Sequence, residues 1–464
     1  MHGVFIESGP SDWQIIQHEN GTANIRLSGT FQVPSAAIEV GTESACPVVR
    51  VLSEDDNSQI LPWTKTNLHP GEDGMSGAWD TTLTLPAGGL YRIETGLDTK
   101  STKPELTWVF RGDVRLHIGV GDLFIIAGQS NSSGYGRDSA LDPPDLHVHL
   151  YRNRDSWDLA CHPMNESSFA ADKPNAEMGI SGTSPYLSFG KALHKISGYP
   201  VGFIMTAQGG SPISRWDTRQ NGDLFHNMIT QIRKCTEKAA GILWYQGCAD
   251  TTPTNSVKYL DCFRHFVTET RKELGYTISF FTFQLNRQMN ADYSEEWGII
   301  REAQRQAARM LSSVYILPTL HCGLCDGIHN NSHSAMMLGE NMAKLCGGIL
   351  YHTPGFFAPD ISDAVYADHV IRLMFDHMRR GFLVVNNNPC QCCFYVRDSA
   401  GTIPIISLGA VKDNPCLDLT LEREPDTSLQ ISYCRDADPS HIALFDEVTF
   451  MPPLSFYDFP VKRV

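Results

Sequence analysis

The chain has 464 residues, of which 42% are hydrophobic and 19% charged, and its formal net charge is −15. This composition is sufficient for a sizeable core, which excludes a wholly disordered chain. The acidic balance argues against nucleic acid or an anionic membrane surface as the main partner. No apolar run approaches the roughly 18 residues of a membrane span, so we expect no membrane partner.

The compartment follows from the first residues and from the cysteines. Residues 1–10 lack the basic stretch and the long apolar segment of a secretory signal. The 13 cysteines are odd in number and scattered, unlike a secreted disulfide framework. We therefore expect a cytoplasmic protein, or a secreted or periplasmic one if a signal has been removed.

Residues 1–118 show the alternation of apolar and polar side chains that is typical of short β-strands. Ala23, Ile25 and Leu27 alternate with polar residues, and Leu83 and Leu85 do the same. The pattern predicts an N-terminal β-sandwich-like module. Its tryptophans could form a sugar platform, although packing is the commoner role; they are Trp13, Trp63, Trp79 and Trp108.

From residue 119 to residue 352, apolar strands alternate with helical patterns. This alternation predicts a parallel sheet covered by helices on both faces, a three-layer α/β/α core. The irregular insertion at 134–183 is long, and we expect it to form part of a substrate rim. The predicted strands are Leu123–Ala127, Val201–Met205, Ile242–Tyr245, Ile278–Phe283 and Val314–Leu317, and the predicted helices are Tyr186–Ile196, Leu224–Cys235, Val257–Val267, Trp297–Leu311 and Ser332–Leu350.

Residues 353–464 return to short alternating segments after Thr353-Pro354-Gly355 breaks the last helix. Leu417 and Leu419 alternate with polar residues, and the segment Leu429–Tyr433 alternates as well. We therefore predict a second, C-terminal β-sandwich-like module.

A candidate nucleophile follows the first strand of the core. Leu123–Ala127 leads into Gly128-Gln129-Ser130-Asn131, which places a serine hydroxyl at the carboxyl edge of the sheet. Ligands bind at this edge in open α/β sheets. Ser130 is a nucleophile if a base reaches it, and otherwise a helix N-cap.

The candidate base lies after the last strand of the core, in Asp326-Gly-Ile-His329. At this spacing the carboxylate can accept a hydrogen bond from one imidazole nitrogen and leave the other for Ser130. Two further strand ends carry possible oxyanion donors. The glycines of Gln208-Gly-Gly-Ser211 allow a backbone N–H to approach a ligand, and Gln246 offers a side-chain amide.

Four motifs carry a resemblance to a known family: Gly128–Asn131, Gln208–Trp216, Trp244–Gly247 and Asp326-x-x-His329. Together they resemble the sialate O-acetylesterase-like branch of the SGNH (GDSL-type) hydrolases, which includes related carbohydrate acetylesterases. The resemblance implies removal of O-acetyl groups from carbohydrates, with no metal or other cofactor. An acetylated carbohydrate is the implied partner, and sialic acid esters, xylan fragments and other acetylated glycans all fit.

The resemblance also implies roles for individual residues. Ser130 would be the nucleophile, His329 the base and Asp326 the residue that orients it. The oxyanion donors would be the N–H groups of Ser130 and Gly210 and the side chain of Gln246. The expected substrate-side residues are Gln129, Asn131, Arg215 and Trp216, and Arg137 or Arg215 could pair with the carboxylate of a sialate.

The chain departs from the family at Cys248, where a glutamate usually stands. The departure removes a carboxylate that could assist the histidine, and it introduces a thiol that could compete as nucleophile. It also motivates a rival hypothesis, a carbohydrate-binding protein with a degenerate site. A general short-chain esterase is another alternative.

Metal-based alternatives rest on cysteine and histidine spacing. Cys322-x-x-Cys325 stands beside His321, and a second group is Cys390-x-Cys392-Cys393. Neither gives a complete four-ligand zinc set, so buried reduced thiols are the competing interpretation. We also see no tight ligand cluster for a metal-dependent deacetylase.

Overall fold

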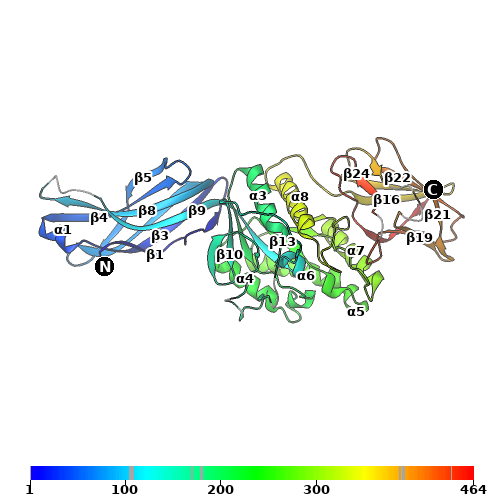
Figure 1. Cartoon of the computed structure of the whole chain (residues 1–464), viewed down its shortest axis with the longest axis horizontal. Helices are drawn as coiled ribbons and strands as arrows, with labels where there is room; N and C mark the ends of the chain where they lie inside the picture. Colours follow the sequence, from blue (N-terminus) through cyan, green and yellow to red (C-terminus); the bar gives the residue numbers. More distant parts are fainter. Residues whose placement is uncertain are drawn as a thin grey trace.

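The computed structural model describes residues 2–103, 109–168, 170, 172–177, 181–385, 388, 392–439 and 442–464. Trp108 and Cys390 lie outside these residues. Three regions follow one another along the long axis of the molecule, with the N-terminal strands at one end and the C-terminal strands at the other (Figure 1). The predicted mixed α/β character is confirmed by several sheets and by helices concentrated in the middle region.

The N-terminal region is built from long antiparallel strands. The side chains of Ala23, Ile25 and Leu27 point into one core with Leu83 and Leu85, as their alternation predicts. One sheet has the order β1 (Gly3–Ser8), β3 (Thr22–Gln32), β7 (Ser76–Pro86) and β6 (Asn67–Pro70). In the other sheet, β4 (Thr42–Ser53) pairs with β5 (Gln59–Lys65) and with β8 (Gly88–Ser101). Strand β9 (Val109–Gly128) pairs with β8 and with β2 (Ile15–Gln17). The short helix α1 (Ser35–Glu39) precedes β4.

Strand β9 links this region to the middle of the molecule without a break. Its first half pairs with β8, from Val109 to Val120, and its second half pairs with β12 and β13, from Asp122 to Gly128. The predicted boundary at residue 118 therefore falls inside a continuous strand. The end of this strand carries the Gly128-Gln-Ser-Asn motif, so the N-terminal sheet is continuous with the candidate site.

The middle region holds a mostly parallel sheet in the order β11-β10-β12-β9-β13-β14-β15. Its apolar strands were all predicted, because residues buried on both faces form unbroken apolar runs. They are β12 (Val201–Met205), β13 (Gly241–Tyr245), β14 (Ser279–Phe283) and β15 (Val314–Leu317), beside the second half of β9.

Helices lie along both sides of this sheet (Figure 1). Phe124 and Ile126 of β9 pack with α3 and α8, whereas Ile125 and Ala127 pack with α4, α6 and α7. The predicted helices are confirmed to within a few residues, except that a short α5 precedes α6 and leaves Val257 exposed. The helices are α3 (Pro185–Ser197), α4 (Asp223–Cys235), α5 (Pro253–Ser256), α6 (Tyr259–Leu274), α7 (Ser294–Met310) and α8 (Ser332–Leu350).

The insertion at 134–183 was expected to be irregular, and this expectation was wrong for part of it. Strand β10 (Val148–Arg152) joins the parallel sheet beside β12, and β11 (Ser156–Leu159) pairs with it at the edge. His149 and Arg152 interrupt the apolar pattern of β10, although both are buried. His149 can be buried because both ring nitrogens lie within hydrogen-bond distance of backbone carbonyls.

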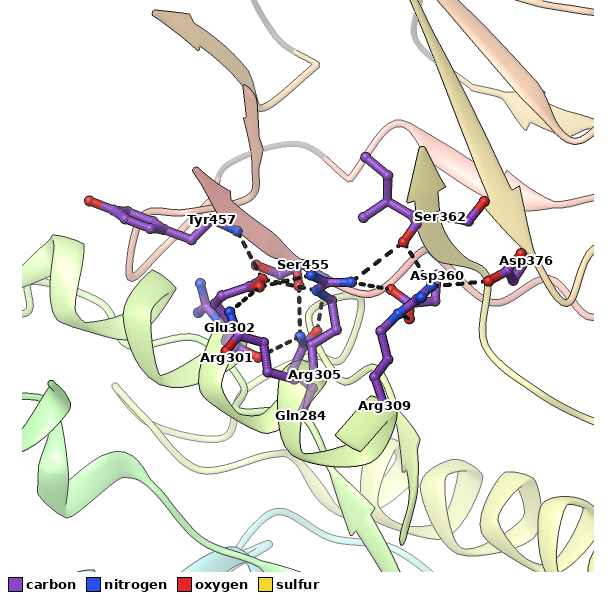
Figure 2. A network of polar contacts seen from close by, with 12 residues as sticks. Gln284, Arg301, Glu302, Arg305, Arg309, Asp360, Ser362, Asp376, Ser455 and Tyr457 are labelled. Atoms are coloured by element: carbon purple, nitrogen blue, oxygen red, sulfur yellow. Dashed lines mark hydrogen bonds and ion pairs between the residues drawn. The ribbon is translucent and has the colours of Figure 1, made fainter. Parts of the chain in front are cut away.

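The C-terminal region is again made of β-strands, and it packs against α7 (Figure 2). Its predicted alternating segments correspond to β22 (Cys416–Leu421) and β23 (Gln430–Tyr433). One sheet has the order β21 (Ile405–Ala410), β22 (Cys416–Leu421), β17 (Val370–Asp376), β16 (Asp360–Ala367) and β26 (Lys462–Arg463). The others contain β18 (Phe382–Val384) with β24 (Leu444–Asp446), and β20 (Gly401–Ile403), β19 (Phe394–Asp398), β23 (Gln430–Tyr433) and β25 (Phe456–Pro460).

The described tryptophans of the N-terminal region form no shared aromatic surface. Trp79 is buried and donates to the carbonyl of Thr30, and Trp13 packs against two histidine rings. Trp63 is partly exposed beneath the guanidinium groups of Arg50 and Arg111. None of the helices in the described ranges has both the length and the apolar character needed to cross a membrane.

Candidate active site

A sharp turn at the end of β9 places Ser130 at the carboxyl edge of the sheet. Gly128 has a φ of +119°, and a Cβ at this position would lie 2.4 Å from the carbonyl oxygen of Tyr245. Only glycine fits this close approach without strain. Ser130 then opens the short helix α2 (Ser130–Ser133) with its side chain 6% exposed.

The structure brings Ser130, His329 and Asp326 together from distant parts of the chain. The Nε2 atom of His329 lies 2.9 Å from Oγ of Ser130, and its Nδ1 lies 2.7 Å from Oδ2 of Asp326. A carboxylate can only accept, so Nδ1 carries the imidazole proton and Nε2 is left to accept from the serine hydroxyl. This is the arrangement in which a histidine removes the proton of an attacking serine.

The turn from Asp326 to His329 is held by the carboxylate itself. Oδ1 of Asp326 accepts from the backbone N–H of Ile328 at 2.8 Å and from that of His329 at 2.7 Å. Burial raises the pKa of Asp326, but the hydrogen bonds from the His329 ring and from these two N–H groups outweigh it, and the net pKa is lowered. Asp326 therefore stays ionised in the range where His329 must be neutral to act as a base.

Two backbone N–H groups, that of Ser130 itself and that of Gly210, are available to bind an oxyanion. The loop after β12 lies against the end of β9, since the N–H of Gln208 donates to the carbonyl of Gly128 at 3.0 Å. Gly210 in this loop has a φ of +68°, which favours glycine. Within the described residues, the N–H groups of Gly210 and Ser130 have no hydrogen-bond acceptor.

The third expected donor, the side chain of Gln246, is not free in this structure. Gln246 is fully buried, and its Nε2 donates to the carbonyl of Ser211 at 3.1 Å and to Oδ2 of Asp250 at 2.6 Å. Its Oε1 accepts from the hydroxyl of Tyr259 at 2.9 Å. Both amide hydrogens are thus used inside the protein, and Gln246 fixes two loops rather than facing a ligand.

Three of the four expected substrate-side residues are also turned inward or paired. Trp216 is 0% exposed and packs edge-to-face on Trp244 in the core. Gln129 is buried and accepts from the N–H of Gly247 at 2.9 Å. Arg215 is partly exposed, but it is held by Asp223 and by Oε1 of Gln208 at 2.7 Å. The sequence could not reveal these directions, because side-chain orientation depends on the packing of distant elements.

Asn131, the fourth of these residues, lies next to the nucleophile. Its Oδ1 accepts from the backbone N–H of Asn330 at 3.0 Å, which ties α2 to the loop of His329. Its Nδ2 is buried and has no hydrogen-bond partner within the described ranges. An unpaired buried amide is costly, so Asn131 has an N–H group to offer at the site.

The insertion contributes Arg137, a possible sialate contact from the sequence, and two residues that the sequence analysis does not name, Tyr135 and Glu177. The ring of Tyr135 packs on that of His329 at a centroid distance of 4.8 Å, and the guanidinium of Arg137 lies over the ring of Tyr135, 4.7 Å from its centroid. The hydroxyl of Tyr135 donates to Oε2 of Glu177 at 2.7 Å, and Oε1 of Glu177 accepts from the N–H of Gly209 at 2.7 Å. Apart from the length of the insertion, no periodic signal marks Tyr135 and Glu177.

The thiol of Cys248 is a poor candidate for the nucleophile. Burial raises the pKa of Cys248 to about 12, so the thiol stays protonated at neutral pH. Its Sγ lies 3.6 Å from Oδ1 of Asn286. Within the described ranges, no group of three or more His, Cys, Asp and Glu side chains is placed to hold a metal ion.

Known proteins share the sequence and the fold around this site. Residues 120–347 match the family described as carbohydrate esterase, sialic acid-specific acetylesterase. The chain is 22% identical over 246 residues to the probable carbohydrate esterase At4g34215 of Arabidopsis thaliana, which covers 48% of this chain and 88% of that protein. The crystal structure of XAC1771, titled a novel carbohydrate acetylesterase from Xanthomonas citri, has a TM-score of 0.65 at 19% identity and covers 96% of this chain and 97% of that one.

The family match spans β9 to α8 and includes Ser130, Gly210, Asp326 and His329. The likeness to XAC1771 extends over the flanking β regions as a likeness of fold. Residues 120–347, which hold the whole candidate site, thus match the carbohydrate esterase family of sialic acid-specific acetylesterases.

Proposed function

We propose that this protein is a serine esterase that removes O-acetyl groups from carbohydrates through an acetyl-enzyme intermediate. The observation that carries the proposal is the continuous contact from Ser130 through His329 to Asp326. The proposed scaffold is an SGNH-type core at residues 119–352, with a three-layer α/β/α arrangement and a β module on each side. The match of residues 120–347 to a carbohydrate esterase family supports an ester of a sugar as the substrate.

In the first step, Oγ of Ser130 attacks the acetyl carbonyl carbon while Nε2 of His329 takes the hydroxyl proton. The carbonyl oxygen becomes an oxyanion, and the unpaired N–H groups of Ser130 and Gly210 are the donors that we propose to stabilise it. The bond to the sugar oxygen then breaks, and that oxygen takes the proton from His329. The ionised Asp326 stabilises the imidazolium that exists between these two transfers.

In the second step, water attacks the acetyl group on Ser130 while His329 takes one of its protons. The new tetrahedral intermediate collapses, acetate leaves, and the proton on His329 returns to Oγ of Ser130. Each proton transfer uses the same nitrogen, Nε2, so one base serves both halves of the reaction. No step requires a metal or another cofactor.

A sialate is the substrate that the family description favours, and Arg137 is the cation best placed to recognise its carboxylate. Arg137 is exposed, stacks on Tyr135 and makes no ion pair with a described carboxylate. Arg215, in contrast, is already paired with Asp223. An Arg137→Ala variant should lose activity on acetylated sialate and keep it on a neutral acetylated xyloside.

Hydrolysis of p-nitrophenyl acetate and p-nitrophenyl butyrate by the native protein and by Ser130→Ala tests the proposal. We expect a strong preference for acetyl and a loss of at least about 10³-fold in kcat in the variant. Comparable rates on butyrate would favour a general short-chain esterase. No hydrolysis, together with retained glycan binding, would favour the carbohydrate-binding alternative.

A further inference from the structure

The loop that carries the proposed catalytic pair rests on a second loop, residues 285–289, which follows β14. We call residues 326–329 the catalytic loop and residues 285–289 the support loop. The side-chain amide of Asn286 donates to the carbonyl of Ile328, and the N–H of Met289 donates to the carbonyl of Gly327 at 2.8 Å. Two hydrogen bonds thus fix the catalytic loop to the support loop.

The support loop is itself held by Arg301, a fully buried residue of α7 (Figure 2). Nε of Arg301 donates to the carbonyl of Leu285 at 3.0 Å, and Nη2 donates to that of Asn286. Burial lowers the pKa of Arg301 to about 10, so the guanidinium remains charged at neutral pH. Within the described residues it has no carboxylate partner; its donors go to backbone carbonyls, and its Cζ lies 5.8 Å from the ring centroid of Trp297.

The remaining donors of Arg301 reach into the C-terminal region. Nη1 donates to the carbonyls of Cys434 at 3.0 Å and Asp436 at 2.7 Å, and Nη2 also donates to that of Ala437 at 3.2 Å. A planar guanidinium with several fixed donors suits this role, because it can hold two chain segments in one geometry. Arg301 therefore joins the support loop to residues 434–438, which we call the C-terminal bracket.

The C-terminal bracket also contacts the support loop directly. The N–H of Gln288 donates to the carbonyl of Ala437 at 3.0 Å, and Arg287 pairs with Asp438 at 3.0 Å. Ala437 is buried in the same hydrophobic cluster as α4, α6 and α7. Ala437 is thus part of the interior of the middle region, although it belongs to the C-terminal region by sequence.

We propose that Arg301 is a positioning residue through which the C-terminal region sets the geometry of the catalytic loop. The inference rests on the proposed function of Ser130, His329 and Asp326, and it deepens that function by assigning the C-terminal region a part in it. Arg301 holds the support loop, and Asn286 and Met289 of that loop contact the catalytic loop. Arg301 therefore acts on the reacting atoms indirectly. The C-terminal strands are then a component of the hydrolytic site rather than a separate binding module.

Arg305, one turn along α7, provides a matched control. It is also buried, and it contacts the C-terminal region through an ion pair with Asp360 at 3.0 Å; a second ion pair, at 2.8 Å, joins it to Glu302 of α7 itself (Figure 2). Within the described residues, Arg305 makes no hydrogen bond to the support loop, unlike Arg301. Both arginines therefore stabilise the same interface, but only Arg301 connects it to the catalytic loop.

The experiment compares Arg301→Lys and Arg305→Lys in the full chain. Lysine keeps the charge but loses the planar set of donors. We expect Arg301→Lys to lower kcat on p-nitrophenyl acetate by about 10²-fold with KM little changed, the loss that a misplaced catalytic group causes. Amide hydrogen exchange should accelerate at Met289 and in residues 324–330 of this variant. Arg305→Lys should leave kcat and exchange in these segments close to native.

An equal loss of kcat and of exchange protection in both variants would overturn the proposal, because it would show only general support of the interface. Native behaviour of Arg301→Lys would overturn it as well. If Arg301→Lys does not fold, Arg287→Ala is used to test the connection between the C-terminal bracket and the support loop. This variant removes the partly exposed ion pair with Asp438 and should speed amide hydrogen exchange at Met289. Exchange is measured without substrate, so it tests the positioning even if the native protein hydrolyses no ester and the proposed function fails.

Discussion

Asp250 is a buried carboxyl group whose ionisation should make stability depend on pH. Its Oδ2 accepts from Nε2 of Gln246 at 2.6 Å and from the N–H of Ile213 at 2.9 Å, and burial raises its pKa to about 6. The pKa in the unfolded chain is about 3.9. Between these values the folded state binds more protons than the unfolded one, so this group makes the free energy of unfolding fall as pH rises from about 4 to about 6.

Asp250→Asn should remove this dependence, because the amide oxygen can still accept both hydrogen bonds while carrying no charge. Between pH 4 and pH 7, we expect the free energy of unfolding of the native protein to fall by about 2 to 4 kcal/mol relative to that of the variant. Urea unfolding of both proteins at several pH values measures it. A difference that is constant over this range would show that Asp250 titrates as it does in the unfolded chain.

Cys248 should be dispensable for hydrolysis. Its pKa of about 12 leaves almost no thiolate at neutral pH, and its Sγ faces Asn286 rather than Ser130. We expect Cys248→Ala to keep kcat on p-nitrophenyl acetate within about threefold of native, since such a change removes no group that acts in the transition state. A loss as large as that of Ser130→Ala would instead identify the thiol as the nucleophile.

The residues of the site differ in how far the sequence reveals them. Ser130, Asp326 and His329 could be predicted to meet, because each follows a buried strand and the carboxyl ends of parallel strands share one edge. Trp216 and Gln246 stand in equally plausible motifs, yet both are buried and bonded inside the protein. Whether a side chain at a strand end faces the ligand or the core is decided by packing between elements far apart in the chain.

At the scale of elements, the insertion at 134–183 connects the base to the oxyanion loop. Tyr135 packs on His329 and donates to Glu177, which in turn accepts from the N–H of Gly209. This last bond fixes the peptide that precedes Gly210. The insertion was predicted to form a substrate rim, and its contacts add a role in the geometry of the site.

Glu177→Ala should therefore lower kcat more than it weakens the binding of substrate. The variant leaves the N–H of Gly209 without its charged acceptor, a bond of the kind that contributes about 1.5 to 3 kcal/mol. We expect kcat to fall at least about tenfold, with a smaller change in KM. Glu166→Ala is the control, because Glu166 lies in the same insertion and, within the described residues, accepts from the nearby Ser168, whose N–H lies at 2.6 Å. Equal effects of the two changes would count against a special role for Glu177.

The elements themselves were largely predictable. Strands β12 to β15 are mostly apolar runs, and the main helices show their spacing clearly. Strand β10 was missed because His149 and Arg152 interrupt its apolar pattern, and their burial depends on carbonyl and carboxylate partners supplied by other segments. Local sequence does not reveal such partners.

At the scale of the whole molecule, the three regions are joined by a shared strand and by side-chain contacts of a shared helix. Strand β9 runs from the N-terminal sheet to Gly128, and α7 is shared with the C-terminal strands through a network of buried charges (Figure 2). Asp360 at the start of β16 pairs with Arg305 and Arg309 of α7. Arg309 also pairs with Asp376 of β17 at 3.1 Å.

Removal of Asp360 should destabilise the molecule as a whole. Asp360→Ala leaves the buried guanidinium of Arg305 with Glu302 as its remaining carboxylate, and breaking a buried pair in this way costs about 3 to 5 kcal/mol. The matched control is Asp363→Ala, which removes a surface pair with Lys462 and should lower the free energy of unfolding far less. Urea unfolding of both variants measures the difference, and similar values for the two would contradict a central role of the α7 network.

The central claim is that Ser130 carries the acetyl group between the two steps of the reaction. Acid quenching of the native protein during turnover of p-nitrophenyl acetate, followed by peptide mass spectrometry, tests it most directly. We predict an acetyl group on the peptide that contains Ser130, and its absence from Ser130→Ala treated in the same way. An acetyl group on another residue, or native turnover by Ser130→Ala, would contradict the account.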